Sequence, residues 1–450
     1  MQEALSGDKK VFLETFGCQM NENDSDRILG FLKDIRYSRT YEPGKADLII
    51  INTCSIRDKA EQKVYSALGR FKELKSWNPG LIIGVSGCVA QQQGAKLLKR
   101  APYLDIVFGP HNIHRLKDLL DEASLKKRPV AVEQSAEIGA DEYGFTLPST
   151  KHRAFVSIMR GCDNFCAYCI VPYTRGREVS RGSAEVVEEV KRLSDEGVKE
   201  VTLLGQNVNS YGNNGGDVSF PCLLRMVAGV EGIERIKFIT SHPKDISEEL
   251  IYLFRDEPKL CRHIHLPVQS GSDGVLRKMG RGYTVDEYFS RVSLLRSLYP
   301  GMAITTDMIV GFPGETGADF DDTMALLDRV RFDSIFSFMY SPRPGTKAAS
   351  FKEQVPFEVK SERLRILMAA QREISLERNR RLEGSTIEVV VEGASKTDVE
   401  ELSGRTSCGR VVNFPAPEGE RTEAGCLIDV SITHAFPNSL RGMVAERLKA

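Results

Sequence analysis

The sequence predicts a multidomain α/β protein with an open parallel α/β sheet, a partial (β/α)6 barrel and a small carboxyl-terminal β-barrel. Three observations predict this architecture. Strand and helix signals alternate in two separate blocks, a stretch without sustained periodicity divides these blocks, and the last segment carries only short strands. We expect domains at residues 9–126, 151–381 and 382–448, with a linker at residues 127–150.

The first block, with apolar runs at residues 11–18, 46–54 and 80–88, has the alternation typical of a parallel sheet covered by helices. The runs end at Cys18, Cys54 and Cys88. Because the carboxyl ends of neighbouring parallel strands share one edge of a sheet, where ligands bind, we expect these thiols to meet at one spot. Helix amino termini just after each cysteine favour the thiolate, by about 0.3–1 kcal/mol per helix at exposed positions. Three separately packed core cysteines are the alternative, since free Cys is often buried.

The second block cycles about six times through strand and helix signals, which predicts βα units that curl into a barrel or part of one. The expected strands are residues 154–159, 200–205, 235–240, 263–267, 303–310 and 334–340. Ser183 is the expected N-cap of one covering helix, and Gly197 lies near its end. A later helix, from about Phe357 to about Glu383, carries six arginines, which are most often a solvated face.

A Cys-x3-Cys-x2-Cys loop, formed by Cys162, Cys166 and Cys169, directly follows the first barrel strand. Three thiolates can hold three corners of an iron–sulfur cube and leave the fourth iron open for a small molecule, whereas electron-transfer clusters take four cysteines. A structural zinc site also takes four ligands, and no other His or Cys lies close enough in sequence to complete one. A zinc-binding loop or three packed thiols is the alternative.

Polar residues lie at the ends of the other barrel strands, where function sits in such barrels. They are Gln206 and Asn207, Ser241 and His242, Gln269, and Asp307. Taken singly, each is typical of a turn or a cap. Their shared placement predicts a polar pocket beside the cysteine loop.

The last segment alternates apolar and polar residues in short runs, with Gly and Pro at turns, which predicts short antiparallel strands in a small barrel. From residue 381 to the end, the chain has eight Lys or Arg against eleven Asp or Glu. Affinity that rests on many phosphate contacts requires a basic surface. We therefore expect no strong electrostatic binding of nucleic acid by this segment, apart from a small cluster around Arg405, Arg410 and Arg441.

The composition is that of an ordinary globular protein, with 41% hydrophobic and 27% charged residues and a net charge of −1. No apolar run approaches a membrane span, and residues 1–10 lack the apolar segment of a secretory signal. We therefore expect the ten cysteines to be reduced thiols in the cytoplasm. Four of them show no ligand spacing and are expected to be packing or incidental thiols: Cys222, Cys261, Cys408 and Cys426.

The loop RGCDNFCAYCIVPYTRGRE at residues 160–178 resembles that of radical S-adenosylmethionine (SAM) enzymes, in which the open iron chelates SAM. Motifs along nearly the whole chain resemble the radical SAM methylthiotransferases. This family combines an amino-terminal domain with three cluster cysteines, a radical SAM barrel and a carboxyl-terminal TRAM domain. The motifs include TFGCQMNENDS, INTCSIRDKAEQKVYSALGR, SGCVAQQQG, LLGQNVNSY, HLPVQSGSDGVLRKMGRGYT, TDMIVGFPGET, YSPRPGT and NSLRGMV.

Within this family, GCQMN around Cys18 is similar to the branch that acts on isopentenyl-adenosine in tRNA. The branch for threonylcarbamoyl-adenosine tends to GCKVN, and the branch for a ribosomal protein tends to GCPKN. A sister branch stays open as an alternative, as does a non-catalytic metal-bound RNA-binding protein that uses its cysteines structurally.

The resemblance implies two 4Fe–4S clusters. The radical-generating cluster would be held by Cys162, Cys166 and Cys169, and an auxiliary cluster that carries the sulfur to be inserted by Cys18, Cys54 and Cys88. One SAM would methylate that sulfur, and another would give the 5′-deoxyadenosyl radical that abstracts hydrogen from C2 of the modified adenine. Gln206 and Asn207 would approach SAM, with Ser241, Gln269 and Asp307 as further candidates.

The partners implied are tRNA, bound through its anticodon stem-loop, an electron donor such as flavodoxin or ferredoxin, and a sulfur donor. We expect a monomeric cytoplasmic protein without a membrane anchor. Proteins recognise a splayed-out loop nucleotide by stacking. Phe165, Tyr168 and Tyr173 lie near the cluster cysteines and are candidates for this role, with core packing as the alternative for each.

Overall fold

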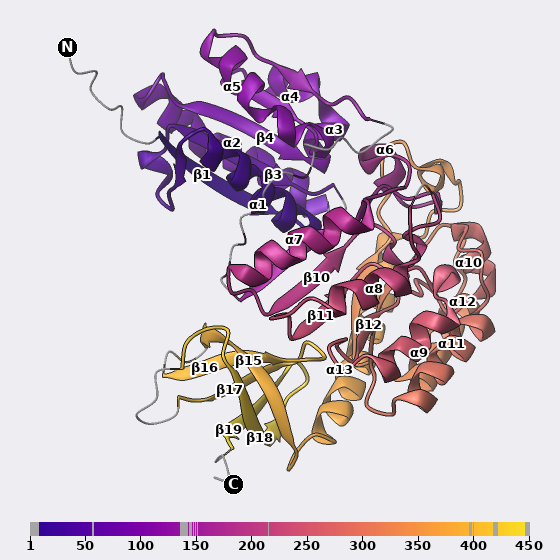
Figure 1. The fold of residues 1–450 in the computed structure, drawn as a ribbon. Coiled ribbons are helices and arrows are strands. Elements are labelled where there is room, and N and C mark those ends of the chain that lie inside the picture. Colours follow the sequence, from indigo (N-terminus) through magenta and orange to yellow (C-terminus); the bar gives the residue numbers. More distant parts are fainter. Residues whose placement is uncertain are drawn as a thin grey trace.

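The chain folds into three parts that follow one another in sequence (Figure 1). The computed structural model describes residues 9–55, 58–135, 143, 146, 148, 150, 152–214, 216–395, 398, 400–416 and 422–445. The amino-terminal sheet and the carboxyl-terminal β-barrel lie at opposite ends of the view, and the (β/α) barrel contacts both (Figure 1). Among the described helices, none has the length and apolar character needed to cross a membrane.

An open six-stranded sheet forms the amino-terminal part, as predicted, and its strands pair in parallel in the order β2-β1-β3-β4-β5-β6. The strands are β1 (Lys9–Phe16), β2 (Tyr37–Arg39), β3 (Leu48–Thr53), β4 (Ile82–Gly87), β5 (Ile106–Phe108) and β6 (Val130–Ala131). The helices are α1 (Gln19–Asp34), α2 (Asp58–Trp77), α3 (Cys88–Gln93), α4 (Ala95–Arg100) and α5 (Leu116–Ser124). β3 is buried along its whole length, because apolar clusters cover both of its faces.

The amino-terminal sheet extends into the range expected to be a linker. β6 lies within residues 127–150 and pairs with β5 through Val107–Val130 and Phe108–Ala131. A strand of two residues is too short to show an alternation in the sequence. Residues 136–142, 144–145, 147, 149 and 151 lie outside the described residues, and the expected domain boundaries stay predictions.

Six parallel strands form the central part in two three-stranded sheets, β11-β10-β7 and β12-β13-β14. The strands are β7 (Arg153–Ser157), β10 (Glu200–Leu204), β11 (Arg235–Phe238), β12 (His263–His265), β13 (Ala303–Val310) and β14 (Ser334–Met339). A parallel bridge between Ile236 and Leu260 joins the sheets. All six expected strands are present, and β7 and β14 are the outer strands of this part of the described chain. The partial barrel is therefore confirmed.

Helices surround this partial barrel, and a short ribbon follows its first strand. The helices are α6 (Val171–Arg175), α7 (Ser183–Asp195), α8 (Phe220–Ala228), α9 (Glu248–Asp256), α10 (Asp273–Met279), α11 (Val285–Leu298) and α12 (Gly317–Val330). The ribbon pairs β8 (Met159–Arg160) with β9 (Val179–Ser180). Short 3-10 helices are η1 (Pro43–Lys45), η2 (Pro110–Arg115), η3 (Val208–Ser210), η4 (Pro243–Asp245) and η5 (Lys347–Ser350).

The start of α7 differs from the prediction. The helix begins at Ser183, so Gly182 is its N-cap. The Asp217 carboxylate accepts from the Ser183 amide at 3.2 Å and from the Ser183 hydroxyl at 2.6 Å. Because an ionised carboxylate is a stronger acceptor than a hydroxyl, a residue distant in sequence takes the capping role. The predicted end is confirmed, since α7 stops at Asp195 and Gly197 has a φ of 92°.

The long helix predicted from Phe357 is α13 (Phe357–Arg380), which connects the two barrels. Two of its arginines depart from the expected solvated face. Arg363 donates to Glu315 at 2.6 Å, and Arg378 donates to Asp333 at 2.7 Å, in pairs that are largely buried.

A closed five-stranded barrel forms the carboxyl-terminal part. Its strands are β15 (Thr386–Ala394), β16 (Glu401–Thr406), β17 (Val411–Pro415), β18 (Leu427–Ala435) and β19 (Ser439–Val444). Four neighbouring pairs are antiparallel, as predicted, but β17 and β19 pair in parallel. An odd number of strands cannot alternate direction all the way around a closed ring, so one parallel pair is required.

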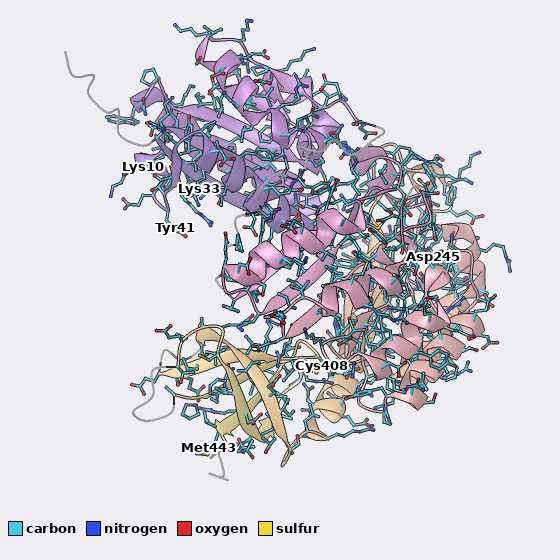
Figure 2. The ribbon with its side chains drawn as sticks, in the orientation of Figure 1. Lys10, Lys33, Tyr41, Asp245, Cys408 and Met443 are labelled. Carbon is cyan, nitrogen blue, oxygen red and sulfur yellow. The ribbon has the colours of Figure 1, made fainter. Side chains whose placement is uncertain are left out.

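Asp333 attaches this terminal barrel to the rest of the chain. Its buried carboxylate accepts from Arg378 of α13 and from Arg410, which precedes β17. Arg410 also donates to the Oδ1 of Asn379 at 2.9 Å and to the Sγ of Cys408 at 2.7 Å. Cys408 lies where the two barrels meet (Figure 2).

We expect Asp333→Asn to lower the free energy of unfolding by about 2–4 kcal/mol, because two partly buried guanidinium groups lose their carboxylate. Urea unfolding combined with limited proteolysis between the barrels measures this effect. The control is Asp286→Asn, which removes an exposed partner of Arg329 and should cost less than about 1 kcal/mol. Equal effects of the two substitutions would contradict the role of Asp333.

Candidate active site

The three amino-terminal cysteines lie together at the carboxyl edge of their sheet, as predicted. The register pairs Phe16 with Thr53 and Thr53 with Gly87, so the residues that follow β1, β3 and β4 are neighbours. These are Cys18, Cys54 and Cys88, which we call the amino-terminal cysteine group. Cys18 is the N-cap of α1, and Cys88 is the first residue of α3.

Hydrogen bonding and burial act differently on these thiols. A hydrogen bond between the side chains of Cys18 and Cys54 lowers the pKa of Cys18 to about 6. Burial raises the pKa of Cys88, against the opposing charge of Arg175. Cys54 thus acts on Cys18, and Cys18 acts on Cys88, which agrees with the shared sheet edge.

A close approach of two strands and a buried amide network support this edge. A Cβ at Gly87 would lie 2.3 Å from the Thr53 carbonyl oxygen, so only glycine allows β4 to approach β3 next to Cys88. Asn21 donates to the Asn52 side chain at 3.0 Å, and Asn52 donates to the Asn21 carbonyl at 2.8 Å. Both amides are fully buried. Sequence reasoning missed this network.

The barrel cysteine loop, Cys162, Cys166 and Cys169, lies between β8 and α6. Burial raises the pKa of Cys162 to about 11 and that of Cys169 to about 12. Without a metal these groups are neutral thiols, whereas a bound metal ion deprotonates a coordinating thiol. Arg281, which is also buried, donates to the Sγ of Cys166 at 3.3 Å and to the Pro267 carbonyl at 2.6 Å.

The two cysteine groups belong to neighbouring elements. α3 begins at Cys88, α6 begins two residues after Cys169, and these helices contact each other. Within the described residues, no three or more His, Cys, Asp or Glu side chains are placed so that they could hold a single metal ion. The thiolates of an iron–sulfur cluster each bind a different iron and need not converge on one point, whereas the ligands of a mononuclear zinc site do.

Three of the residues expected to form the polar pocket, Gln206, Ser241 and Gln269, follow barrel strands as predicted and have unused polar atoms. Asp307 was expected at a strand end but lies in the middle of β13. The Nε2 of Gln206, the Oγ of Ser241 and the Oε1 of Gln269 are buried and have no hydrogen-bond partner. Each uncompensated atom of this kind costs about 1–3 kcal/mol. Gln269 also has a φ of 75°, a strained value for this residue type. Together these features fit a polar ligand such as SAM.

Asn207 and Asp307 are placed differently from these three residues. Asn207 is fully buried, accepts from the His242 amide at 3.1 Å and donates to the Asp245 carboxylate at 2.7 Å, so both ends of its amide are engaged. Asp245 lies on the barrel, in η4 (Figure 2). Asp307, on β13, is half-buried and its Oδ1 lies 3.5 Å from the Nε2 of His265.

The three aromatic candidates separate into two kinds. Phe165 and Tyr173 are exposed beside the cysteine loop, with ring centroids 6.3 Å apart in an edge-to-face arrangement. Tyr168 instead packs against a small apolar cluster, and its hydroxyl accepts from Arg281 at 3.3 Å. Phe165 and Tyr173 therefore present a surface for stacking, whereas Tyr168 supports the loop.

Comparison with known proteins agrees with this organisation. Three family models match in chain order: the uncharacterized protein family UPF0004 over residues 10–109, the radical SAM superfamily over residues 156–327 and the TRAM domain over residues 380–445. A tRNA-2-methylthio-N(6)-dimethylallyladenosine synthase from Citrifermentans bemidjiense is 52% identical, over 97% of this chain and 98% of that protein. Proteins of the same name from Syntrophotalea carbinolica and Geobacter metallireducens are 51% and 50% identical, over 96% and 98% of this chain and 99% of each relative.

The chain belongs to the radical SAM methylthiotransferase family. This result confirms the resemblance inferred from the cysteine loop and the flanking motifs, including the branch indicated by GCQMN.

Solved structures share the fold of this methylthiotransferase at low sequence identity. The radical SAM methyltransferase TsrM from Kitasatospora setae, with cobalamin and a [4Fe-4S] cluster bound, aligns with a TM-score of 0.57 at 15% identity, over 76% of this chain and 74% of that one. The cobalamin-dependent radical SAM enzyme OxsB, with aqua-cobalamin and SAM bound, aligns with a TM-score of 0.51 at 14% identity, over 81% and 56%. Both therefore share the fold over most of this chain.

Glu178 is a site residue that the sequence did not reveal. It follows the barrel cysteine loop, and its carboxylate accepts from the Ser210 hydroxyl at 2.7 Å, while its Oε1 is buried without a partner. Burial raises its pKa to about 7 from 4.5. The cue in the sequence was only its closeness to the cysteines.

The raised pKa of Glu178 makes stability depend on pH. Between pH 4.5 and about 7 the folded state binds this proton more tightly than the unfolded state, so stability falls as pH rises through that window. Over this window the parent should lose about 3 kcal/mol of its free energy of unfolding, and we expect Glu178→Gln to remove this loss. Urea unfolding of the metal-free protein at pH 5 and pH 8 measures the difference, with Glu185→Gln at an exposed position of α7 as the control. Parallel pH dependence in Glu178→Gln and the parent would refute the assignment.

Proposed function

We propose that this protein is a tRNA methylthiotransferase that converts N6-dimethylallyladenosine next to the anticodon into its 2-methylthio derivative. One SAM serves as methyl donor and a second as the source of a 5′-deoxyadenosyl radical. The observation that supports this best is the presence of two separate three-cysteine groups on contacting elements of two domains. The chain is also 50–52% identical, nearly throughout, to relatives that carry this name.

In this proposal each cysteine group holds one 4Fe–4S cluster, and each cluster keeps one iron free of protein ligands. When bound, the barrel cluster supplies the electron that cleaves SAM, and the auxiliary cluster presents the sulfur to be transferred. The first is held by Cys162, Cys166 and Cys169, and the second by Cys18, Cys54 and Cys88. Arg281 fixes the Cys166 sulfur and offsets its negative charge.

SAM occupies the polar pocket at the strand ends. Gln206, Ser241 and Gln269 offer their unused polar atoms to it. Asn207 holds the turn that carries Ser241, through its bonds to His242 and Asp245. Asp307 lies half-buried on the neighbouring strand β13 and adds a carboxylate.

The tRNA anticodon loop is recognised mainly beside the barrel cysteine loop. Phe165 and Tyr173 provide exposed aromatic faces there for a splayed-out base. The three arginines of the small basic cluster expected on the terminal barrel each pair with a carboxylate, which reduces the positive charge that they offer to phosphate: Arg405 with Glu392, Arg410 with Asp333 and Arg441 with Glu401. The electron donor, the sulfur donor, a monomeric state and a cytoplasmic location stay predictions.

Cluster assignment is tested with two triple variants. We expect anaerobically reconstituted protein to carry about eight irons per chain, from two cubes of four. Replacing Cys162, Cys166 and Cys169 by Ala should leave about four irons and abolish 5′-deoxyadenosine formation. Replacing Cys18, Cys54 and Cys88 should also leave about four irons, but 5′-deoxyadenosine should still form without methylthio product. Cys426→Ala, at an exposed thiol outside both groups, is the control and should keep all of the iron.

SAM cleavage that survives the barrel triple substitution would refute the site assignment. Colourless, zinc-loaded protein after anaerobic purification would instead favour a non-catalytic RNA-binding protein.

The substrate is tested in cells that lack this protein. We expect their tRNA to accumulate N6-dimethylallyladenosine and to lose its 2-methylthio form, as measured by mass spectrometry of the digested nucleosides. Complementation with the parent chain should restore the modification, whereas the barrel triple variant should not. An unchanged nucleoside profile would redirect the proposal to a sister branch.

A further inference from the structure

One buried side chain connects the two cysteine groups. Arg175 is the last residue of α6, six positions after Cys169, and it points away from the barrel into the amino-terminal sheet domain. Only 6% of the residue is exposed. α6 lies where these two parts of the molecule meet (Figure 1).

Arg175 binds the elements that carry the amino-terminal cysteine group. Its Nη2 donates to the Oδ2 of Asp24 at 2.6 Å and its Nη1 to the Oδ1 at 3.4 Å. Asp24 is almost fully buried on α1, the helix that Cys18 caps. The positive charge of the guanidinium also opposes the effect of burial on the pKa of Cys88. A single planar group thus binds the helix behind Cys18 and acts electrostatically on Cys88.

We propose that Arg175 is a positioning residue that sets the amino-terminal cysteine group in register with the barrel cysteine loop. The inference rests on the proposed function, in which one nucleobase must reach both sites. A buried bidentate pair of guanidinium and carboxylate fixes the relative orientation of the two groups as well as their distance. Because misplacement by about 1 Å can cost about a hundredfold in rate, such a bond determines whether a radical formed at one site is used at the other.

The surroundings make this role separable from folding. Asp24 also accepts from Arg27 at 3.4 Å, so removal of Arg175 does not leave a buried carboxylate without a cation. A second bond crosses the same junction: the Asn23 side chain donates to the Phe155 carbonyl at 3.0 Å. Asn23 lies on α1 as well, and within the described residues its side chain makes no hydrogen bond to a cysteine. It therefore offers a matched control.

The experiment compares Arg175→Met, Arg175→Lys and Asn23→Ala with the parent. For Arg175→Met we expect unchanged iron content, 5′-deoxyadenosine formation within about twofold of the parent, and at least a tenfold loss of methylthio product per 5′-deoxyadenosine formed. Arg175→Lys keeps the charge but not the bidentate geometry. It should therefore recover only part of the ratio of methylthio product to 5′-deoxyadenosine. Asn23→Ala should keep it.

A second measurement uses the metal-free protein and needs no activity. Hydrogen–deuterium exchange should increase in α1 and α6 of Arg175→Met, while exchange in the carboxyl-terminal β-barrel stays as in the parent. An unchanged product ratio overturns the inference. So does an equal loss in Asn23→Ala, or a parallel loss of iron, SAM cleavage and product. A parent protein that makes no methylthio product refutes the proposed function instead, and the exchange experiment then still decides whether Arg175 connects the two parts.

Discussion

The structure depends on keeping thiols buried where the strand-end edges of two domains meet. Burial raises the pKa of Cys88, Cys162 and Cys169, so each favours its neutral form unless a cation lies beside it. The fold brings one buried arginine to each group: the charge of Arg175 acts on Cys88, and Arg281 donates to the Sγ of Cys166. A guanidinium beside each group favours negatively charged sulfur, which the proposed clusters would require.

Parallel strand order is what assembles these groups from distant parts of the chain. In a parallel sheet all strands end at the same edge, whereas an antiparallel sheet would place alternate ends on opposite sides. Cys18, Cys54 and Cys88 are neighbours because β1, β3 and β4 are adjacent and point in one direction. The terminal barrel differs, because most of its neighbouring strands are antiparallel.

Sequence reasoning predicted what local patterns encode and missed what depends on contact between distant segments. The amino-terminal group could be predicted because its cysteines end apolar runs, and the barrel group because of its Cys-x3-Cys-x2-Cys spacing. Arg175, Arg281 and the Asn21–Asn52 network could not, because an arginine or asparagine in sequence carries no sign of the partner it will meet. The same limit explains the cap of α7, which Asp217 provides from a separate loop.

The ion pairs of the arginines in the terminal barrel bear on where the proposed tRNA substrate would be recognised. In the terminal barrel, Arg405 and Arg441 already pair with Glu392 and Glu401, which offsets the positive charge that a phosphate would meet there. Phosphate contacts position a nucleic acid, whereas stacking and base contacts recognise it. The exposed rings of Phe165 and Tyr173 stand next to the residues that would hold the radical-generating cluster. In the proposed function, this arrangement favours recognition of the base beside the barrel cysteine loop over binding that depends on positive charge in the terminal barrel.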